Sequence, residues 1–404
     1  MRSRGPLRPV HAAALALLGA LLSAPAAADD EALRREREEF QQGMALFKQG
    51  QYGGAAAIWE PIVARLGDER GYRLLYNLGV AYQEAGLATP AAEIPEASLL
   101  RLQKQILLLA KTTDGIVGVS ALHLESSRTV SVRGREQFPM ASIVKVPIAV
   151  QLMKLVDEGK LSLDKMITLS PSDLHPGSGN LTELLFHPGL SISLENLMEI
   201  MLVISDNSAA DLCLREAGGP AAVTDRMREM GLKIRVDRNI ALLIADWVGV
   251  NVKQLPPESE WNKDMWERLE NAVPDKEHLQ ARRASIADPR DTSSPDDMTQ
   301  LIAHIWKKDT LEPASANVLI GVLQRCITGK ARIKGMLPAG TEVAHKTGTL
   351  GGVVDDAGVI TLPNGAGHLV VSVFTKGFGK PSETAEKAVA EISRTLYDYF
   401  SLVQ

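Results

Sequence analysis

Three short strings occur in order along this chain of 404 residues, and together they constrain its fold and chemistry more than any other feature. They are Ser142-Ile143-Val144-Lys145, then Ser205-Asp206-Asn207, then Lys346-Thr347-Gly348. Each string alone is weak evidence, because Ser162-Leu163-Asp164-Lys165 repeats the S-x-x-K pattern elsewhere in the chain. The three together, in this order, indicate a serine acyl hydrolase whose nucleophile is an active-site serine.

The first string carries the predicted nucleophile. An apolar run follows Ser142 and predicts a buried helix, at whose N-terminus a hydroxyl lies beside free backbone N–H groups. Lys145 stands one helical turn further on, within reach of that hydroxyl. A lysine acts as a base only if desolvation or a nearby cation lowers its pKa. Ser162 follows Gly159, where the helix should have ended, and is therefore predicted to lie in a surface linker.

The other two strings supply polar groups that the first one lacks. Ser205-Asp206-Asn207 lies between two apolar helical stretches, so we predict an interhelical turn that directs a hydroxyl and an amide into a cleft. Lys346 follows a short strand-like stretch at 342–344 and adds a cation that favours anionic substrates and lowers the pKa of Lys145. Gly348 has no Cβ, so a substrate can lie against this strand edge and pair with its backbone.

From about Glu96 to the C-terminus the chain resembles the class A β-lactamases, within the wider family of penicillin-recognising serine enzymes. Besides the three strings, four segments resemble family segments: Phe138-Pro139-Met140, Gly218-Gly219-Pro220, Thr328 to Ile333, and Leu337 to Gly340. The resemblance implies that Ser142 is acylated, that Lys145 is a general base, and that Ser205 relays a proton to the leaving nitrogen. These three are the predicted catalytic residues.

The resemblance also implies a set of substrate-binding residues. Asn207 would bind the side-chain amide of the substrate, and its carboxylate would be held by Lys346, Thr347 and Arg332. The oxyanion hole would come from the backbone N–H groups of Ser142 and Thr349, and one such donor is worth about 10² to 10³ in rate. The implied ligands are β-lactams or peptidoglycan peptides, with no cofactor.

One segment departs from the family pattern. Asp237-Arg238 and Arg290-Asp291-Thr292 resemble the ends of a loop that carries the deacylating glutamate, and an Arg238–Asp291 ion pair would pin them together. Ile240 stands where that glutamate belongs, inside a loop at 239–290 that is longer than the family's. We predict slow deacylation unless the insert supplies a substitute carboxylate, for which the candidates are Asp246, Glu258, Glu260, Glu267 and Glu270. The charged stretch from 261 to 283 is predicted to be a solvated helix over the cleft.

Residues 1–28 are predicted to be a secretory signal peptide. Arg2, Arg4 and Arg8 precede an apolar core too short to span a membrane, and an A-x-A cleavage site follows before Asp29. The mature chain is therefore predicted to be periplasmic or secreted, with no membrane span. There the two cysteines, Cys213 and Cys326, either form a disulfide or remain buried thiols, and the sequence leaves both open.

Residues 29–95 are predicted to form a separate helical segment. Gly43 to Gly50 recurs as Gly79 to Gly86, offset by 36 residues, and Ala55, Ala56 and Trp59 provide packing positions between the two. The pattern resembles tetratricopeptide repeats, and a plain amphipathic hairpin is the alternative. So few repeats cannot bury a continuous core, so the segment is expected to dock on the catalytic domain or on a protein partner.

Composition and strand patterns complete the prediction for residues 96–404. A net charge of −5 provides no basic patch for nucleic acid, and the scattered histidines show no metal-site spacing. The expected fold is α+β, an antiparallel sheet flanked by helices with an all-helical lobe beside it. Strands are expected at 115–124, 129–132, 342–346, 358–362 and 368–375, with an Asn364-Gly365 hairpin turn and a closing helix over 383–400.

Three functions fit these observations. A β-lactamase is the primary prediction, and a peptidoglycan D,D-peptidase or other serine esterase is the alternative among enzymes. A penicillin-binding sensor or scaffold that recruits partners through residues 29–95 is the alternative among non-enzymes. Turnover separates the enzymes from the sensor, which would be acylated without release.

The nucleophile assignment is tested by covalent labelling with a fluorescent penicillin. Ser142→Ala should abolish labelling, and Lys145→Ala should slow it by about 10² to 10⁴, the usual contribution of a positioned base. Ser162→Ala, the matched control, should label like the wild type. Labelling that survives in Ser142→Ala would contradict the assignment.

Overall fold

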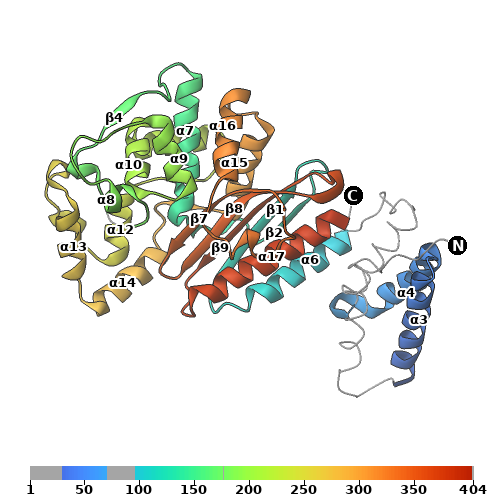
Figure 1. Ribbon diagram of the computed structural model, residues 1–404. Helices are drawn as coiled ribbons and strands as arrows, with labels where there is room; N and C mark the ends of the chain where they lie inside the picture. The colour runs from blue at the N-terminus through green and yellow to red at the C-terminus, as the bar shows by residue number, and fades with distance from the viewer. Residues whose placement is uncertain (1–29, 71–95, 176, 403–404) are drawn as a thin grey trace. The chain divides into compact units, whose positions relative to one another are not determined.

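Strands rich in β-branched residues form the central sheet of the computed structural model, which describes residues 30–70, 96–175 and 177–402. The five-stranded sheet is antiparallel throughout, in the order β2-β1-β9-β8-β7 (Figure 1). Its strands are β1 (Ile116–His123), β2 (Thr129–Val132), β7 (Val343–Leu350), β8 (Val353–Thr361) and β9 (His368–Lys376). Strands β8 and β9 are central and almost fully buried, whereas β7 is an edge strand.

Two of the predicted strands are longer than expected. Strand β7 does not end at Lys346 but continues to Leu350, so the Lys-Thr-Gly string lies inside an edge strand. Strand β8 begins at Val353 and not at 358, because two buried aspartates are satisfied within the sheet. Asp355 accepts a hydrogen bond from the Thr375 backbone at 2.8 Å, and Asp356 pairs with His345 at 2.8 Å. The predicted hairpin turn is confirmed, since a 3-10 turn at 363–365 joins β8 to β9.

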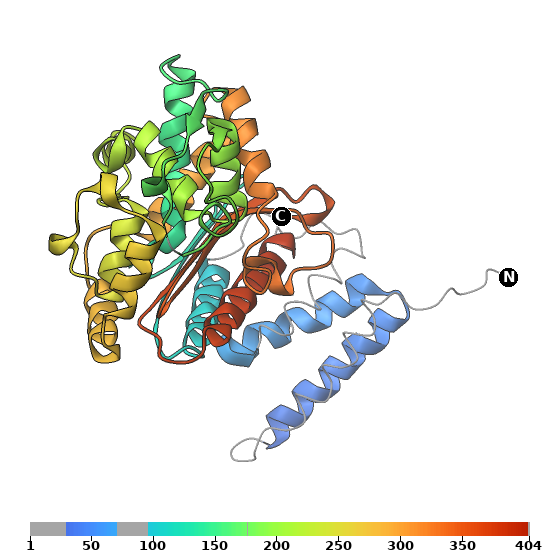
Figure 2. The same ribbon diagram turned by 60° about the vertical axis from the view of Figure 1, so that its left-hand side comes forward.

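Helices cover both faces of the sheet. Helices α6 (Glu96–Ala110) and α17 (Ser382–Leu402) lie side by side on one face, as Figures 1 and 2 both show. Helix α15 (Pro295–Lys307) packs against β1, β8 and β9 on the other face. It contributes an apolar side that includes Met298 and Leu301, both fully buried. The predicted α+β fold is therefore confirmed.

A helical lobe adjoins the second face of the sheet. Its longest buried helix is α7 (Lys145–Asp157), which contacts α9, α10, α11 and α16. The helices and short strands of this part of the chain are α8 (Leu181–Leu184), α9 (Leu194–Val203), α10 (Asn207–Glu216), α11 (Gly219–Glu229), α12 (Ile240–Val248), α13 (Lys263–Asn271), α14 (Asp275–Ile286), α16 (Pro313–Gln324), β3 (Phe138–Pro139), β4 (Met166–Thr168), β5 (Ser191–Ser193) and β6 (Thr292–Ser293). One continuous apolar cluster joins the lobe to the sheet, from Ile148 and Leu197 to Val370 and Phe374.

The N-terminal unit contains a helical hairpin of α3 (Asp30–Lys48) and α4 (Tyr52–Arg70). Trp59 is buried between the helices, stacks on Phe40 and donates a hydrogen bond to its carbonyl oxygen at 3.3 Å. Gly43 leaves room for the indole, because a Cβ there would lie 2.2 Å from Trp59 Nε1. Ala55 and Ala56 are buried as predicted. The second copy of the repeat, 79–86, lies outside the described residues, so the tetratricopeptide resemblance stays a prediction.

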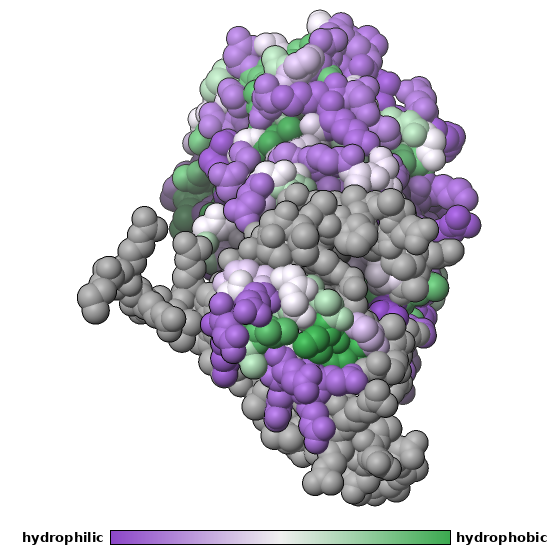
Figure 3. All heavy atoms as spheres, turned by 90° about the vertical axis from the view of Figure 1, so that its right-hand side faces the viewer, coloured by the Kyte–Doolittle hydropathy of each residue, from purple (hydrophilic) through white to green (hydrophobic). Residues whose placement is uncertain are grey.

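The chain divides into two compact units between Arg101 and Leu102. The predicted signal peptide at 1–28 lies outside the described residues, and the predicted limits 29–95 and 96–404 remain predictions. In the segments that the structure describes, no helix has the length and apolarity needed to cross a membrane. On the face drawn in Figure 3, hydrophilic side chains predominate in the upper part, with small apolar groups scattered among them.

Candidate active site

Ser142 lies in a 3-10 turn, Ala141–Val144, that leads directly into helix α7. Two backbone contacts hold this turn. The Met140 N–H donates to the Asp291 carbonyl oxygen at 3.1 Å, and β3 pairs with β6 immediately before the turn. Ala141 has a φ of 44°, which few non-glycine residues adopt, so the turn is tightly constrained by its surroundings. The Ser142 side chain is half-buried and lies at the junction of lobe and sheet.

Lys145 is fully buried beside Ser142. Its Nζ lies 3.3 Å from Ser142 Oγ and donates to the Ser205 carbonyl oxygen at 2.7 Å and to Asn207 Oδ1 at 2.8 Å. Burial lowers the pKa of Lys145 well below its usual range, and the neighbouring Lys346 cation lowers it further. The predicted proximity of Ser142 and Lys145 is therefore present, together with the electrostatic condition under which a lysine can accept a proton.

The turn between α9 and α10 places the second string where it was predicted. Ser205 has a φ of 63°, and its Oγ lies 3.2 Å from Lys145 Nζ and 2.9 Å from Lys346 Nζ. Asp206 fixes the turn, because its carboxylate accepts hydrogen bonds from the backbone N–H groups of Asn180, Leu181 and Ala209 at 2.7 to 2.9 Å. The Ser205 hydroxyl consequently bridges the two buried lysines.

The Lys-Thr-Gly string lies on β7 and faces the turn that carries Ser142. Lys346 is fully buried, and burial lowers its pKa to about 8. Thr347 Oγ1 lies 2.6 Å from the hydroxyl of Thr328. Gly348 has a second role besides the expected access for substrate: a Cβ there would lie 2.6 Å from the Met140 carbonyl oxygen. The missing side chain therefore allows β7 to pack closely against the nucleophile's turn.

Arg332 is 5% exposed, and its guanidinium binds strand β7 by hydrogen bonds. Its guanidinium donates to the Gly348 carbonyl oxygen at 2.9 Å and to Thr349 Oγ1 at 2.6 Å. Further bonds reach the Asp355 carbonyl oxygen and Glu386 Oε1, each at 3.0 Å. Arg332 thus lies next to exposed Thr349, which is predicted to contribute to the oxyanion hole, but these donors bind the protein itself.

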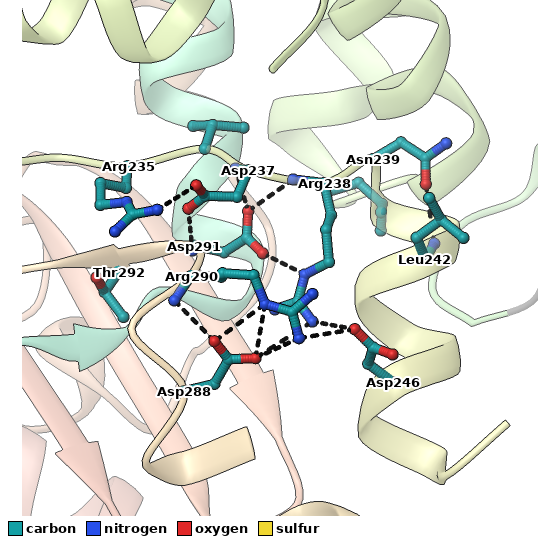
Figure 4. A network of polar contacts seen from close by, with 12 residues as sticks. Arg235, Asp237, Arg238, Asn239, Leu242, Asp246, Asp288, Arg290, Asp291 and Thr292 are labelled. Atoms are coloured by element: carbon teal, nitrogen blue, oxygen red, sulfur yellow. Dashed lines mark hydrogen bonds and ion pairs between the residues drawn. The ribbon is translucent and has the colours of Figure 1, made fainter. Parts of the chain in front are cut away.

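A partly buried ion-pair network closes the long loop (Figure 4). Arg238 Nε lies 2.6 Å from Asp291 Oδ2, so the predicted ion pair is confirmed. Asp237 and Asp291 exchange backbone-to-carboxylate bonds at 2.7 and 2.9 Å. Asp246, one of the candidate replacement bases, is bound by Arg238 and Arg290. The network pins the two ends of the loop next to Met140, two residues before the nucleophile.

Ile240 is 4% exposed and begins α12. Its backbone N–H donates to Asp211 Oδ1 at 2.6 Å, and the N–H of Ala241 donates to Asp211 Oδ2 at 3.0 Å. Burial raises the pKa of Asp211, which His175 Nε2 approaches at 3.3 Å. The side chain of Ile240 therefore lies in a hydrophobic cluster, and its correspondence to the family's glutamate stays a prediction.

The rest of the insert differs from the single solvated helix that was predicted. It forms two helices, and Trp261, Met265 and Trp266 bury an apolar cluster of their own against α12. Of the other candidate carboxylates, Glu258, Glu260 and Glu267 are exposed and Glu270 is half-buried. The tryptophans at 261 and 266 and Met265 are a signal in the sequence from which this cluster could have been predicted.

Two residues that support the site were missed. Asp211 anchors α12, and its signal was an acidic residue one helical turn after Asn207, inside the otherwise apolar stretch from Ala209 to Leu214. Glu386 binds Arg332, and nothing in the sequence around it indicated this role. Both cysteines are free and buried, which leaves the disulfide alternative unrealised in this structure. Among the described residues, no group of three or more His, Cys, Asp or Glu side chains could hold a metal ion.

The arrangement defines a serine hydrolase: a half-buried hydroxyl beside a buried lysine of depressed pKa, next to a second cation on an edge strand. A model of the family described as β-lactamase enzyme family matches residues 101–400. The chain belongs to this family, as its resemblance to the class A enzymes predicted.

Individual relatives agree with this assignment. β-Lactamase VEB-1 of Pseudomonas aeruginosa is 26% identical over 298 residues, covering 72% of this chain and 87% of the relative. The crystal structure of a β-lactamase from Chitinophaga pinensis aligns with a TM-score of 0.60 at 28% identity, covering 74% of this chain and 98% of that one. A PBP-A mutant solved as an acyl-enzyme with penicillin G aligns with a TM-score of 0.59 at 26% identity, covering 75% and 97%.

The pKa of Lys346 generates a prediction about pH. Its cation is present below a pH of about 8 and is lost above it, so recognition of an anionic substrate should decline as pH rises through that value. We expect the ratio of acylation kcat/KM for a penicillin to that for a neutral ester to fall with a midpoint near pH 8. The ratio removes the titration of Lys145, which both substrates share, and kcat/KM reports the free enzyme.

Lys346→Arg is the control for this pH dependence, because a guanidinium stays charged throughout the measured range. Its ratio should remain flat from pH 7 to pH 10. A wild-type ratio that is independent of pH would show that Lys346 does not read the substrate's charge.

Proposed function

We propose that this protein opens β-lactams through an acyl-enzyme on Ser142 and releases the product slowly. The observation that carries the proposal is the combination of a complete acylation apparatus with a buried isoleucine at the deacylation position. Lys145 lies 3.3 Å from Ser142 Oγ, whereas Ile240 is 4% exposed and held by Asp211. The family membership and the relatives' names support the β-lactam class of substrate.

Acylation proceeds from the neutral amine of Lys145. The amine accepts the proton of Ser142 as the hydroxyl oxygen attacks the lactam carbonyl, and the developing oxyanion is bound by the backbone N–H groups of Ser142 and Thr349. Ser205, whose Oγ lies 3.2 Å from Lys145 Nζ, passes a proton to the departing lactam nitrogen. Lys346 and Thr347 bind the substrate carboxylate, and Asn207 binds its side-chain amide.

The role of Arg332 in carboxylate binding is indirect in this proposal. Its donors hold Thr349 Oγ1 and the Gly348 carbonyl oxygen, so it orients the strand edge that the substrate meets. Its positive charge also lowers the pKa of Lys346. The substrate is therefore bound by the edge of β7. Arg332 does not touch the substrate in this proposal but orients that edge through its bonds to Gly348 and Thr349.

Hydrolysis of the ester is the slow step. Water must lose a proton to attack the acyl-enzyme, and an isoleucine cannot accept it. Asp246, the candidate base nearest in sequence to Ile240, forms ion pairs with Arg238 and Arg290. In the limit of very slow release, the protein would act as a penicillin-binding sensor. A PBP-A mutant of similar fold has been solved as an acyl-enzyme with penicillin G.

The setting of this activity follows from the N-terminal residues. The predicted signal peptide at 1–28 supports an exported protein, periplasmic or secreted, where both peptidoglycan and β-lactams occur. The predicted helical segment at 29–95 supports docking to a protein partner, and the described hairpin of α3 and α4 forms part of that segment.

Pre-steady-state hydrolysis of a chromogenic cephalosporin tests the proposal. The wild type should open about one equivalent in a burst and then turn over slowly. Ile240→Glu should raise the steady rate by as much as about 10² to 10⁴, the usual contribution of a general base. Ile240→Gln is the matched control, with similar size but no base, and should keep the slow rate.

Rapid turnover without a burst in the wild type would overturn this account of the loop. In that event, alanine substitutions at the carboxylates of the insert would show which one has taken over. The residues to substitute are Asp246, Glu258, Glu260, Glu267 and Glu270.

A further inference from the structure

We propose that Ser178 is a positioning residue for Lys145: its hydroxyl binds the two oxygens that hold the amine, and it thereby directs the amine's electron pair toward Ser142. This role depends on the proposed function, in which the neutral amine of Lys145 accepts the Ser142 proton. Ser178 belongs to none of the three strings that predicted the site. It lies in the segment that connects β4 to α8.

Ser178 and Lys145 share two hydrogen-bond acceptors. The Ser205 carbonyl oxygen accepts from Ser178 Oγ and from Lys145 Nζ, each at 2.7 Å. Asn207 Oδ1 accepts from Ser178 Oγ at 3.2 Å and from Lys145 Nζ at 2.8 Å. A hydroxyl has a single proton to donate, so the shorter contact, with the Ser205 carbonyl oxygen, is the stronger of the two bonds that Ser178 makes.

The number of donors on the amine gives these contacts a catalytic meaning. A neutral lysine amine has two N–H groups and one electron pair, whereas a carbonyl or amide oxygen can only accept. The short bonds to the Ser205 carbonyl oxygen and Asn207 Oδ1 therefore take both N–H groups of neutral Lys145. The electron pair is left for the hydroxyls of Ser142 and Ser205, which lie 3.3 and 3.2 Å away.

The backbone of Ser205 needs support from its neighbours. Its φ of 63° lies in the left-handed region that few non-glycine residues adopt, so contacts around the turn must hold this conformation. The Ser205 carbonyl oxygen is bound by Lys145 Nζ and by Ser178 Oγ. Lys145 changes its protonation state during acylation, whereas Ser178 remains a constant donor to that oxygen.

Two glycines allow Ser178 to approach the turn. Gly177 and Gly179 have φ values of 103° and 122°. A Cβ on Gly177 would lie 2.5 Å from Asn207 Nδ2, and one on Gly179 would lie 2.2 Å from Asp206 Oδ2. The Asn207 backbone N–H donates to the Ser178 carbonyl oxygen at 2.8 Å and fixes the segment against the turn. The hydroxyl of Ser178 is therefore held in place before any substrate binds.

The hydroxyl also acts on the proton affinity of the amine. Burial and Lys346 on β7 lower the pKa of Lys145, whereas Asp206 in the turn and Asp211 on α10 raise it. Ser178 carries no charge, but its donation to the two shared oxygens makes them poorer acceptors for an ammonium group. Loss of this hydroxyl should therefore favour the charged form of Lys145 and raise its pKa.

Replacement of Ser178 by valine and by threonine separates the hydroxyl from the shape of the side chain, because only threonine keeps a donor. The full-length protein is labelled with 13C at the lysine ε-carbons and titrated. Ser178→Val should raise the Lys145 midpoint by about half a pH unit to one unit, and Ser178→Thr should stay near the wild-type value. Ser172→Val is the matched control and should leave the midpoint unchanged, since the Ser172 hydroxyl contacts Ser170 Oγ at 2.8 Å.

Acylation by a neutral ester is the second measurement, because such a substrate does not depend on the charge of Lys346. Its kcat/KM should rise with pH as Lys145 loses its proton, and in Ser178→Val this rise should occur at higher pH by the same amount. The rate should fall by about threefold to tenfold below the midpoint and recover above it. A rate lowered by the same factor at every pH, with an unmoved Lys145 midpoint, would mean that Ser178 only supports the fold and would overturn the proposal.

Ser178→Ala is the second variant if valine prevents folding, because it removes only the oxygen from an exposed residue. Its Lys145 midpoint should move in the same direction, and an unchanged midpoint would overturn the proposal. The titration requires no β-lactam, so a failure of β-lactam turnover would leave this test standing. Conversely, a Lys145 midpoint that ignores the Ser178 hydroxyl would remove the role of Ser178 and leave the proposed function in place.

Discussion

The site depends on the burial of two lysines that share one serine hydroxyl. Lys145 and Lys346 are both fully buried, and their amines lie 3.2 and 2.9 Å from Ser205 Oγ. Two ammonium groups removed from water and placed around one hydroxyl repel each other, so at least one of them loses its proton more readily. Asp206 and Asp211 offset part of this repulsion at Lys145. The balance leaves one lysine as a potential base beside Ser142 and the other as a potential anion-binding cation.

The surrounding fold holds this unfavourable arrangement in place. Strand β7 can approach the nucleophile's turn because Gly348 makes room for the Met140 carbonyl oxygen. From the other side, the Arg238–Asp291 pair closes the long loop, and the Asp291 carbonyl oxygen binds the Met140 N–H. The turn that carries Ser142 is thus held between a sheet edge and a closed loop. The same loop carries Ile240 into a hydrophobic cluster.

Local patterns in the sequence predicted most of the site, because its central contacts are short in sequence or lie within one element. One helical turn brings Ser142 to Lys145, and the apolar stretches on either side of Ser205 define its turn. The extent of β8 was not predictable in this way, since buried Asp355 and Asp356 are satisfied only by groups from other segments. Long-range partners were missed for the same reason.

Arg332 shows this limit most clearly, because the string around it suggested a ligand role and its partner Glu386 lies 54 residues away. Asp211 supports Ile240 and Ala241 from another helix, and His345 meets Asp356 only after the sheet has formed. A side chain whose partner comes from a distant segment leaves no local pattern in the sequence from which that partner could be predicted. The local chemistry of this site was therefore predictable, whereas its supporting contacts required the fold.

The central claim is that burial makes Lys145 able to accept a proton, and its pKa can be measured directly. The protein is labelled with 13C at the lysine ε-carbons, and the Lys145 signal is assigned by its absence in Lys145→Arg. As the pH is raised, the account predicts that this signal titrates well below the exposed lysines, whose ordinary pKa is about 10.4. A Lys145 signal that titrates together with the exposed lysines would contradict the account, because a lysine that remains charged cannot activate Ser142.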